Sequence, residues 1–510
     1  MARSTRYITT FHLCDMGMAF APIYSKHFRR SFGTHSPKQR ERGLEQAMRN
    51  VIISVCIIGL FLELSGLLWS LKKDNPSETF LALTEPPPRV IEHPLENGYL
   101  LLLGMAAPQG QDPIQTGYDI WLESDTRPTK TGFDFTKSGR SELRLPVAVD
   151  QVVPEWHASN PLEELQKKDA LYRASADRYR LLVTRYEQWL QMPFEDWGYA
   201  HQGTPRIEEL LGAHRLYVAW GFTGQTASGL ERLSLDLGKW RKVLRDARTL
   251  PLKIMATVMI EDDVQLLSGI LSQDSVDRSV LARGLDLLQP LTPGEYSLRW
   301  PLQSHFTLAY MRNRAAELAP LPEPRIDWNP YESIALSARL RSDAFQKVEH
   351  PPNRTALTAS SQSQQTWNTY AAFYEAIITT ADSVHSPLPK LQDIAKNSQR
   401  TFFERVANPL EFEPDWTPFS QRLVETDARL RLVSLQILMR KPTATATIPT
   451  RLAEVGSRYF DPFTGLPMLW SPTQRKLYSV GKDHLDDGGD PSFDISVPLP
   501  VTMASTDHSR

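Results

Sequence analysis

The sequence predicts a mainly α-helical protein with a single N-terminal transmembrane helix, a large antiparallel helical domain and a small C-terminal β module. Three patterns lead to this fold class. Residues 51–71 form a nearly uncharged apolar run. Apolar residues recur at steps of three and four between residues 99 and 442, as in amphipathic helices. Near the C-terminus apolar residues alternate with polar ones, as in β-strands.

The run at 51–71 meets the ~20 residues that a helix needs to cross a bilayer. Basic residues concentrate in the 50 residues before it, which we interpret as a cytoplasmic basic tail. Because positive charge stays on the cytoplasmic side, the C-terminal bulk is expected in the periplasm of a bacterium, anchored in the inner membrane. A cleaved signal peptide and a buried helix of a soluble protein are the two alternatives.

Glu63 is the one charged side chain of this run. A carboxylate at that depth is costly and often functional. With Ser65 and Gly66 beside it, Glu63 predicts a contact with a partner helix in the membrane. A protonated or snorkelling carboxyl in a lone span is the alternative.

The next segments are a spacer and a long helical domain. Residues 72–98 contain Pro86, Pro87 and Pro88 and are predicted to be a proline-rich spacer. Residues 99–442 are predicted to be a periplasmic helical domain. Asn97-Gly98 precedes a short buried helix predicted from Tyr99 to Ala107, and Asp112-Pro113 is typical of a helix N-cap and first helical position.

A long helix is predicted from residue 160 to 192. Its apolar stripe has a seven-residue period, formed by Leu165, Tyr172, Tyr179 and Tyr186. Such a stripe either packs on its own neighbours or binds a partner. Further helices are predicted from 204, around 230–244, from 251, at 276–288, 301–318, 333–345, 367–378 and 388–406, and from 417 to 441.

Residues 443–499 change character and predict the β module, followed by a disordered tail at 500–510. Strands are expected at 468–470 and 476–480, with a third where Phe493, Ile495, Val497 and Leu499 alternate. An acidic, glycine-rich loop lies between the second and third strands.

The module resembles the C-terminal part of the major pseudopilins of type II secretion. The matching residues are Asp461-Pro462-Phe463 with Gly465, Tyr478-Ser479, Gly481, Asp483, Gly488-Gly489 and Asp494-Ile495. The resemblance implies a calcium-binding loop with Asp483 and Asp494 as side-chain ligands. Asp486, Asp487 and Asp490 are added by proximity, since Ca²⁺ takes six to eight oxygens. Solvated aspartates without an ion are the alternative.

The resemblance does not extend to the N-terminal region. No prepilin cleavage site precedes the apolar run, so assembly into a filament is not expected.

Composition and motifs narrow the function. The 57 Lys and Arg balance the 59 Asp and Glu, so no nucleic-acid partner is predicted. Cys14 and Cys56 both precede the expected periplasmic part, which therefore has no disulfide. Metalloprotease, serine-hydrolase and phosphate-loop motifs are absent from the sequence. His201 and His214 are thirteen residues apart and lack a matching acid, so each is interpreted as a core or surface histidine.

These observations favour a non-enzymatic scaffold that binds the membrane and a protein partner in an envelope or secretion-related assembly. The alternatives are a membrane-anchored envelope hydrolase whose site comes together only in the fold, and a ligand-binding sensor.

Overall fold

In a computed structural model, the described residues are 75–126, 161–318, 364–382, 417–440 and 447–500, except 202, 223–225, 274–275 and 277. The chain divides into two units, residues 1–74 and 75–510, and all of the described residues belong to the second. The predicted tail at 1–50, the partner-helix residues Glu63, Ser65 and Gly66, the helices at 333–345 and 388–406, and residues 501–510 lie outside the described residues.

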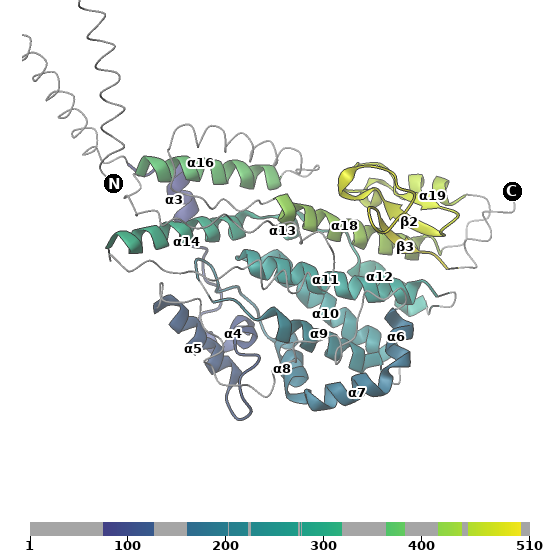
Figure 1. Cartoon of the computed structure of the whole chain (residues 1–510), viewed down its shortest axis with the longest axis horizontal. Helices are drawn as coiled ribbons and strands as arrows, with labels where there is room; N and C mark the ends of the chain where they lie inside the picture. The colour runs from purple at the N-terminus through teal and green to yellow at the C-terminus, as the bar shows by residue number, and fades with distance from the viewer. Residues whose placement is uncertain are drawn as a thin grey trace, which may run out of the picture. The chain divides into compact units, whose positions relative to one another are not determined.

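The described part is mainly helical, which confirms that part of the predicted fold class (Figure 1). Its helices are α3 (Glu78–Thr84), α4 (Gly98–Leu103), α5 (Pro113–Thr126), α6 (Pro161–Lys167), α7 (Asp169–Arg178), α8 (Arg180–Gln191), α9 (Ile207–Phe222), α10 (Thr226–Asp246), α11 (Leu250–Leu271), α12 (Arg278–Leu287), α13 (Pro293–Tyr296), α14 (Arg299–Leu318), α16 (Gln364–Ala381), α18 (Thr417–Leu438) and α19 (Ile448–Glu454).

The transmembrane helix of the predicted fold class is not supported, and we correct it here. None of the described helices is both long enough and apolar enough to cross a bilayer. The most apolar long helix, α11, is interrupted by Lys253, Glu261, Asp262 and Asp263, which carry charge into its middle. The predicted span itself, residues 51–71, is not among the described residues.

Helices α9, α10 and α11 form the core of the unit, with α18 packed on α11. Helix α11 is buried almost all round, as expected for a central helix that has no solvent-facing side. On α10, Leu233, Leu237, Trp240 and Leu244 are buried at the predicted steps of three and four. Burial of each large apolar side chain contributes about 1.5–3 kcal/mol, so these helices hold the unit together.

The stripe at 160–192 lies on three consecutive helices, α6, α7 and α8. The breaks fall at Lys168 and Tyr179, whose backbone leaves the helical conformation. Asp169 opens α7, where the helix dipole favours a carboxylate, and it pairs with Arg173 one turn later. The stripe is buried and α7 and α8 contact α9, so it packs on its own neighbours.

Part of the predicted spacer belongs to the helical unit. Ser77 caps α3, and α3 packs on α14 and α16. Phe80 meets the edges of Phe306 and Tyr310 with ring centroids 5.8 and 5.0 Å away. Asn97 caps α4 and the Asp112 carboxylate receives the Ile114 N–H, which confirms both predicted helix starts.

The C-terminal sheet confirms the predicted strands. Strands β1 (Leu469–Ser471), β2 (Lys476–Ser479) and β3 (Ile495–Pro498) are antiparallel in that order. Tyr478 lies opposite Leu469 in one pair and opposite Ser496 in the other. Strands β2 and β3 contact α18, which is how the sheet joins the helical core (Figure 1).

Candidate functional site

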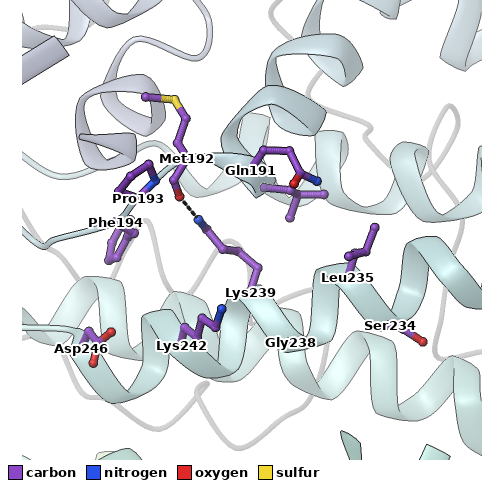
Figure 2. A pocket seen from close by; sticks show the side chains of 11 residues that line it. Gln191, Met192, Pro193, Phe194, Ser234, Leu235, Gly238, Lys239, Lys242 and Asp246 are labelled. Carbon is purple, nitrogen blue, oxygen red and sulfur yellow. Dashed lines mark hydrogen bonds between the residues drawn. The ribbon is translucent and has the colours of Figure 1, made fainter. Parts of the chain in front are cut away.

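A groove of about 500 Å³ lies between α10 and the C-terminal end of α8 with the segment that follows it (Figure 2). Ligand pockets in proteins typically have volumes of ~300–1,000 Å³. Its lining consists of Leu190, Gln191, Met192, Pro193, Phe194, Ser234, Leu235, Gly238, Lys239, Lys242 and Asp246. Sequence analysis did not identify this site, because its two sides lie about 40 residues apart and neither carries a motif.

Lys239 is the central charge of the groove. Its ammonium donates a hydrogen bond of 2.5 Å to the Met192 carbonyl and lies 5.1 Å from the centroid of the Trp189 ring. The residue is only 8% exposed. Burial, followed by the nearby Lys242, lowers the pKa of Lys239 to about 8. The ammonium is therefore short of solvent and of negative charge.

The groove has a positive excess and an apolar wall. The only acid in the lining, Asp246, is paired with Arg245 at 2.8 Å, so it does not offset the two lysines. Leu235 lies at the edge with 47% exposure. An anionic group attached to an apolar group matches this combination.

At Gly238 no side chain projects from α10 into the groove. A Cβ added there would meet nothing within 4 Å, so the fold does not require a glycine at this position. Glycine inside a helix costs about 1 kcal/mol relative to alanine. This cost has no compensation in the packing around Gly238.

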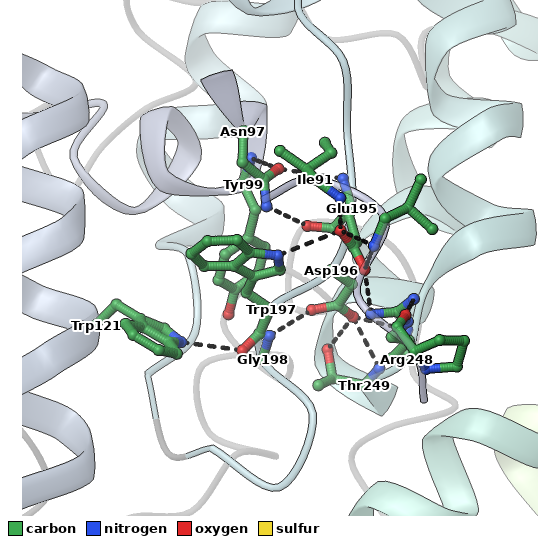
Figure 3. Close-up of polar contacts among 12 residues, drawn as sticks. Ile91, Asn97, Tyr99, Trp121, Glu195, Asp196, Trp197, Gly198, Arg248 and Thr249 are labelled. Carbon is green, nitrogen blue, oxygen red and sulfur yellow. Dashed lines mark hydrogen bonds and ion pairs between the residues drawn. The ribbon is translucent and has the colours of Figure 1, made fainter. Parts of the chain in front are cut away.

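The wall of the groove is held in place by a pair of buried acids, Glu195 and Asp196, which directly follow Phe194 (Figure 3). The Glu195 carboxylate accepts hydrogen bonds from the Val90 and Ile91 N–H groups and forms an ion pair of 2.7 Å with Arg248. These partners lower the pKa of Glu195 although burial opposes them.

Asp196 fixes the same segment to the start of α11. Its carboxylate accepts from the Arg248 and Thr249 N–H groups at 2.7 and 2.9 Å, and from the Gly198 N–H at 2.8 Å (Figure 3). A carboxylate is favoured at a helix N-terminus because the free N–H groups there carry partial positive charge. Burial nevertheless raises the pKa of Asp196 above its ordinary value.

In the acidic loop, the predicted calcium ligands are occupied by local hydrogen bonds. Asp483 accepts from the Leu485 N–H at 3.1 Å, and Asp490 accepts from the Ser492 N–H at 2.9 Å. Asp486 accepts from the Gly488 N–H and the Tyr478 hydroxyl. Asp487 is exposed.

Asp494 differs from the other four aspartates because it is buried. One of its oxygens accepts from the Gly489 N–H at 2.7 Å, and the other has no hydrogen-bond partner. Burial, with Asp487 and Asp486 nearby, raises the pKa of Asp494. Calcium at this loop stays a prediction.

The two histidines without an acid in the sequence both have partners in the fold. His214 forms a 2.7 Å hydrogen bond with Asp236 of α10. In the part of the chain that the structure describes, His214, Asp236 and Asp263 are the one group of three or more such side chains whose ligand atoms converge, within 4.8 Å of one another. One signal could have found them: the aspartates interrupt the apolar stripes of α10 and α11.

His201 lies 2.7 Å from the Ser124 hydroxyl, a pairing relevant to the hydrolase alternative. The same hydroxyl lies 2.8 Å from the Trp121 carbonyl, which can only accept. A hydroxyl has one proton, so when it donates to Trp121 the imidazole must donate to Ser124. In this arrangement the histidine does not act as a base, and the pair does not supply an activated nucleophile.

No protein-family model, curated protein or solved structure matches this chain.

Proposed function

We propose that this chain is a non-enzymatic helical scaffold whose groove binds a segment of a partner protein that carries a carboxylate next to an apolar side chain. The observation that supports it is Lys239, which is 8% exposed and whose ammonium donates a hydrogen bond to the neutral Met192 carbonyl.

A carboxylate is the ligand group that best complements the buried ammonium of Lys239. Charge-assisted hydrogen bonds are stronger than neutral ones, and in a partly desolvated groove they are worth about 1.5–3 kcal/mol. Lys242 lies one turn along α10 and adds a second positive charge. Phosphate would suit the charge, but it would leave the apolar wall uncovered.

The apolar part of the lining selects a chain segment over a small anion. Met192, Pro193 and Phe194 form one side, and Leu235 extends the apolar surface beyond the groove onto the exposed face of α10. Exposed apolar surface beside a polar anchor is typical of protein contacts.

The test uses purified chain and an array of octapeptides in which one glutamate is flanked by leucine or phenylalanine, with a second array that has glutamine instead. We expect binding to the glutamate array only. Lys239→Gln should weaken binding at least tenfold, and Gly238→Phe should abolish it by filling the groove. Lys482→Gln, an exposed change on the C-terminal module, is the matched control.

Fold integrity is checked by circular dichroism and by Gly238→Ala. This substitution should raise the free energy of unfolding by about 1 kcal/mol, because alanine is the better helix residue and has open space here. Equal binding to both arrays, no binding to either, or unchanged binding by folded Lys239→Gln and Gly238→Phe would each overturn the proposal.

A further inference from the structure

Three core helices bring charged side chains together where no solvent reaches. His214 of α9, Asp236 of α10, and Asp262 and Asp263 of α11 all have 0% side-chain exposure. Asp236 also accepts a 2.6 Å hydrogen bond from the Tyr186 hydroxyl, which itself receives the Trp240 N–H. Helices α9, α10 and α11 contact one another, so the group is fixed by the core itself.

The group has two atoms directed at each other without a hydrogen bond. His214 Nδ1 is taken by Asp236 at 2.7 Å, whereas Nε2 has no hydrogen-bond partner and lies 3.9 Å from an Asp263 oxygen. Neither oxygen of Asp263 has an N–H or hydroxyl donor within hydrogen-bond distance, and the nearby Asp236 carboxylate can bond to it only through a shared proton. A buried polar atom without a hydrogen-bond partner is unfavourable, so a core that leaves three of them together lacks a component.

The charges of the group point to the nature of that component. Three carboxylates face a single guanidinium, Arg215, which bonds to Asp262 at 2.7 Å. With all three carboxylates ionised and the imidazole neutral, as metal binding requires, two negative charges remain in a dry interior, where an uncompensated charge is very unfavourable. One divalent cation would neutralise both.

We propose that His214, Asp236 and Asp263 form a buried binding site for a divalent transition-metal ion. One imidazole with two carboxylates suits Zn²⁺, Mn²⁺ or Fe²⁺. Ca²⁺ is excluded by the same donor set, because it requires six to eight oxygens. The three ligand atoms lie within 4.8 Å of one another, so small side-chain shifts, with Asp236 releasing its hydrogen bond to Nδ1, would bring them to the metal–ligand distances of about 2.0–2.2 Å.

The role that follows is structural. The site joins three helices of the core, and a metal bound only by the folded chain adds its binding energy to the stability of the fold. The site is independent of the groove on α10, so its failure would leave the proposed scaffold function untouched.

The experiment measures the metal content of untagged chain, purified without chelator from cells grown with added Zn²⁺ or Mn²⁺. Excess Ca²⁺ is present throughout to occupy the acidic loop. Plasma mass spectrometry should find one equivalent of metal per chain, and removal of the metal should lower the midpoint of thermal unfolding. Asp263→Asn and His214→Gln, which nearly preserve side-chain volume, should each lose the metal.

His305→Gln is the matched control, because His305 bonds to Tyr374 between α14 and α16, away from this group. It should keep the metal. Folded wild-type chain without bound metal would overturn the proposal. Metal that stays in both ligand variants at the wild-type level would also overturn it and would mark the bound ion as adventitious.

Wild-type chain alone provides a second readout in case the ligand variants do not fold. Metal-depleted chain is unfolded and then refolded in the presence of Mn²⁺. The electron paramagnetic resonance signal of free Mn²⁺ should then fall by the amount that corresponds to one ion per chain. A signal that does not fall for refolded chain would also overturn the site.

Discussion

In the helical core, Asp236 and Asp263 lie without solvent exposure among α9, α10 and α11, whereas Asp483 and Asp486 of the C-terminal loop lie exposed. In the loop, each of these two exposed carboxylates accepts a hydrogen bond from the backbone N–H two residues later in the chain. In the core, a carboxylate depends on fixed partners from other helices. The difference shows that the number of acids in a segment does not determine how much they contribute to the free energy of unfolding. Their burial determines it.

The largest expected effect uses the same substitution in both regions. Asp236→Ala leaves the Tyr186 hydroxyl and His214 Nδ1 buried without an acceptor, so it should lower the free energy of unfolding by about 3–5 kcal/mol. Asp483→Ala should change it by less than about 0.5 kcal/mol. Urea denaturation in the presence of chelator measures both. Similar losses for the two variants would remove the distinction between the regions.

A smaller effect concerns a buried cation of the same core. Lys253 on α11 donates to the Leu244 carbonyl, and burial lowers its pKa to about 7. Between about pH 7 and the unfolded value near 10.4, the unfolded chain binds one more proton than the folded chain. Stability should therefore rise with pH across this window, by up to about 1.4 kcal/mol per unit from this group.

Lys253→Met removes that proton and keeps the apolar stem. The free energy of unfolding of this variant, relative to wild type, should be highest near pH 7 and should decline toward pH 9.5. Urea denaturation midpoints at each pH measure this trend. Lys482→Met, on the exposed C-terminal module, is the control and should show no such trend. Parallel pH curves for wild type and Lys253→Met would show that the ammonium is not desolvated in the fold.

The smallest expected effect tests the predicted calcium loop. Ca²⁺ at 100 times its dissociation constant would raise wild-type stability by about 2.7 kcal/mol if the site forms, and by nothing if the aspartates are only solvated. Asp483→Ala and Asp494→Asn should abolish any gain, with Mg²⁺ as the control ion. A gain that survives in both variants would place the calcium elsewhere.

Much of the helical fold followed from local patterns. The starts at Asn97 and Asp112 depend on contacts within two residues of the cap, and the stripe on α10 on the helical period, so both are visible in a sequence. The first two strands followed from the turn between them, and the third followed from alternation. Pattern alone did not show that the stripe at 160–192 breaks at Lys168 and Tyr179.

Neither candidate site could be predicted in the same way. Lys239 meets Met192, and His214 meets Asp236 and Asp263, across sequence separations that no local motif spans. The sequence showed no acid that matches His214, whereas the packing of α9 on α10 and α11 provides Asp236 and Asp263.

The sequence by itself determined where helices and strands form, because secondary structure depends on neighbours within one or two turns. Only the tertiary structure decided which charges lose their water. Desolvation of Lys239 and of the Asp236–Asp263 pair depends on which distant helices cover them. This burial lowers the pKa of Lys239 and raises the pKa of Asp263.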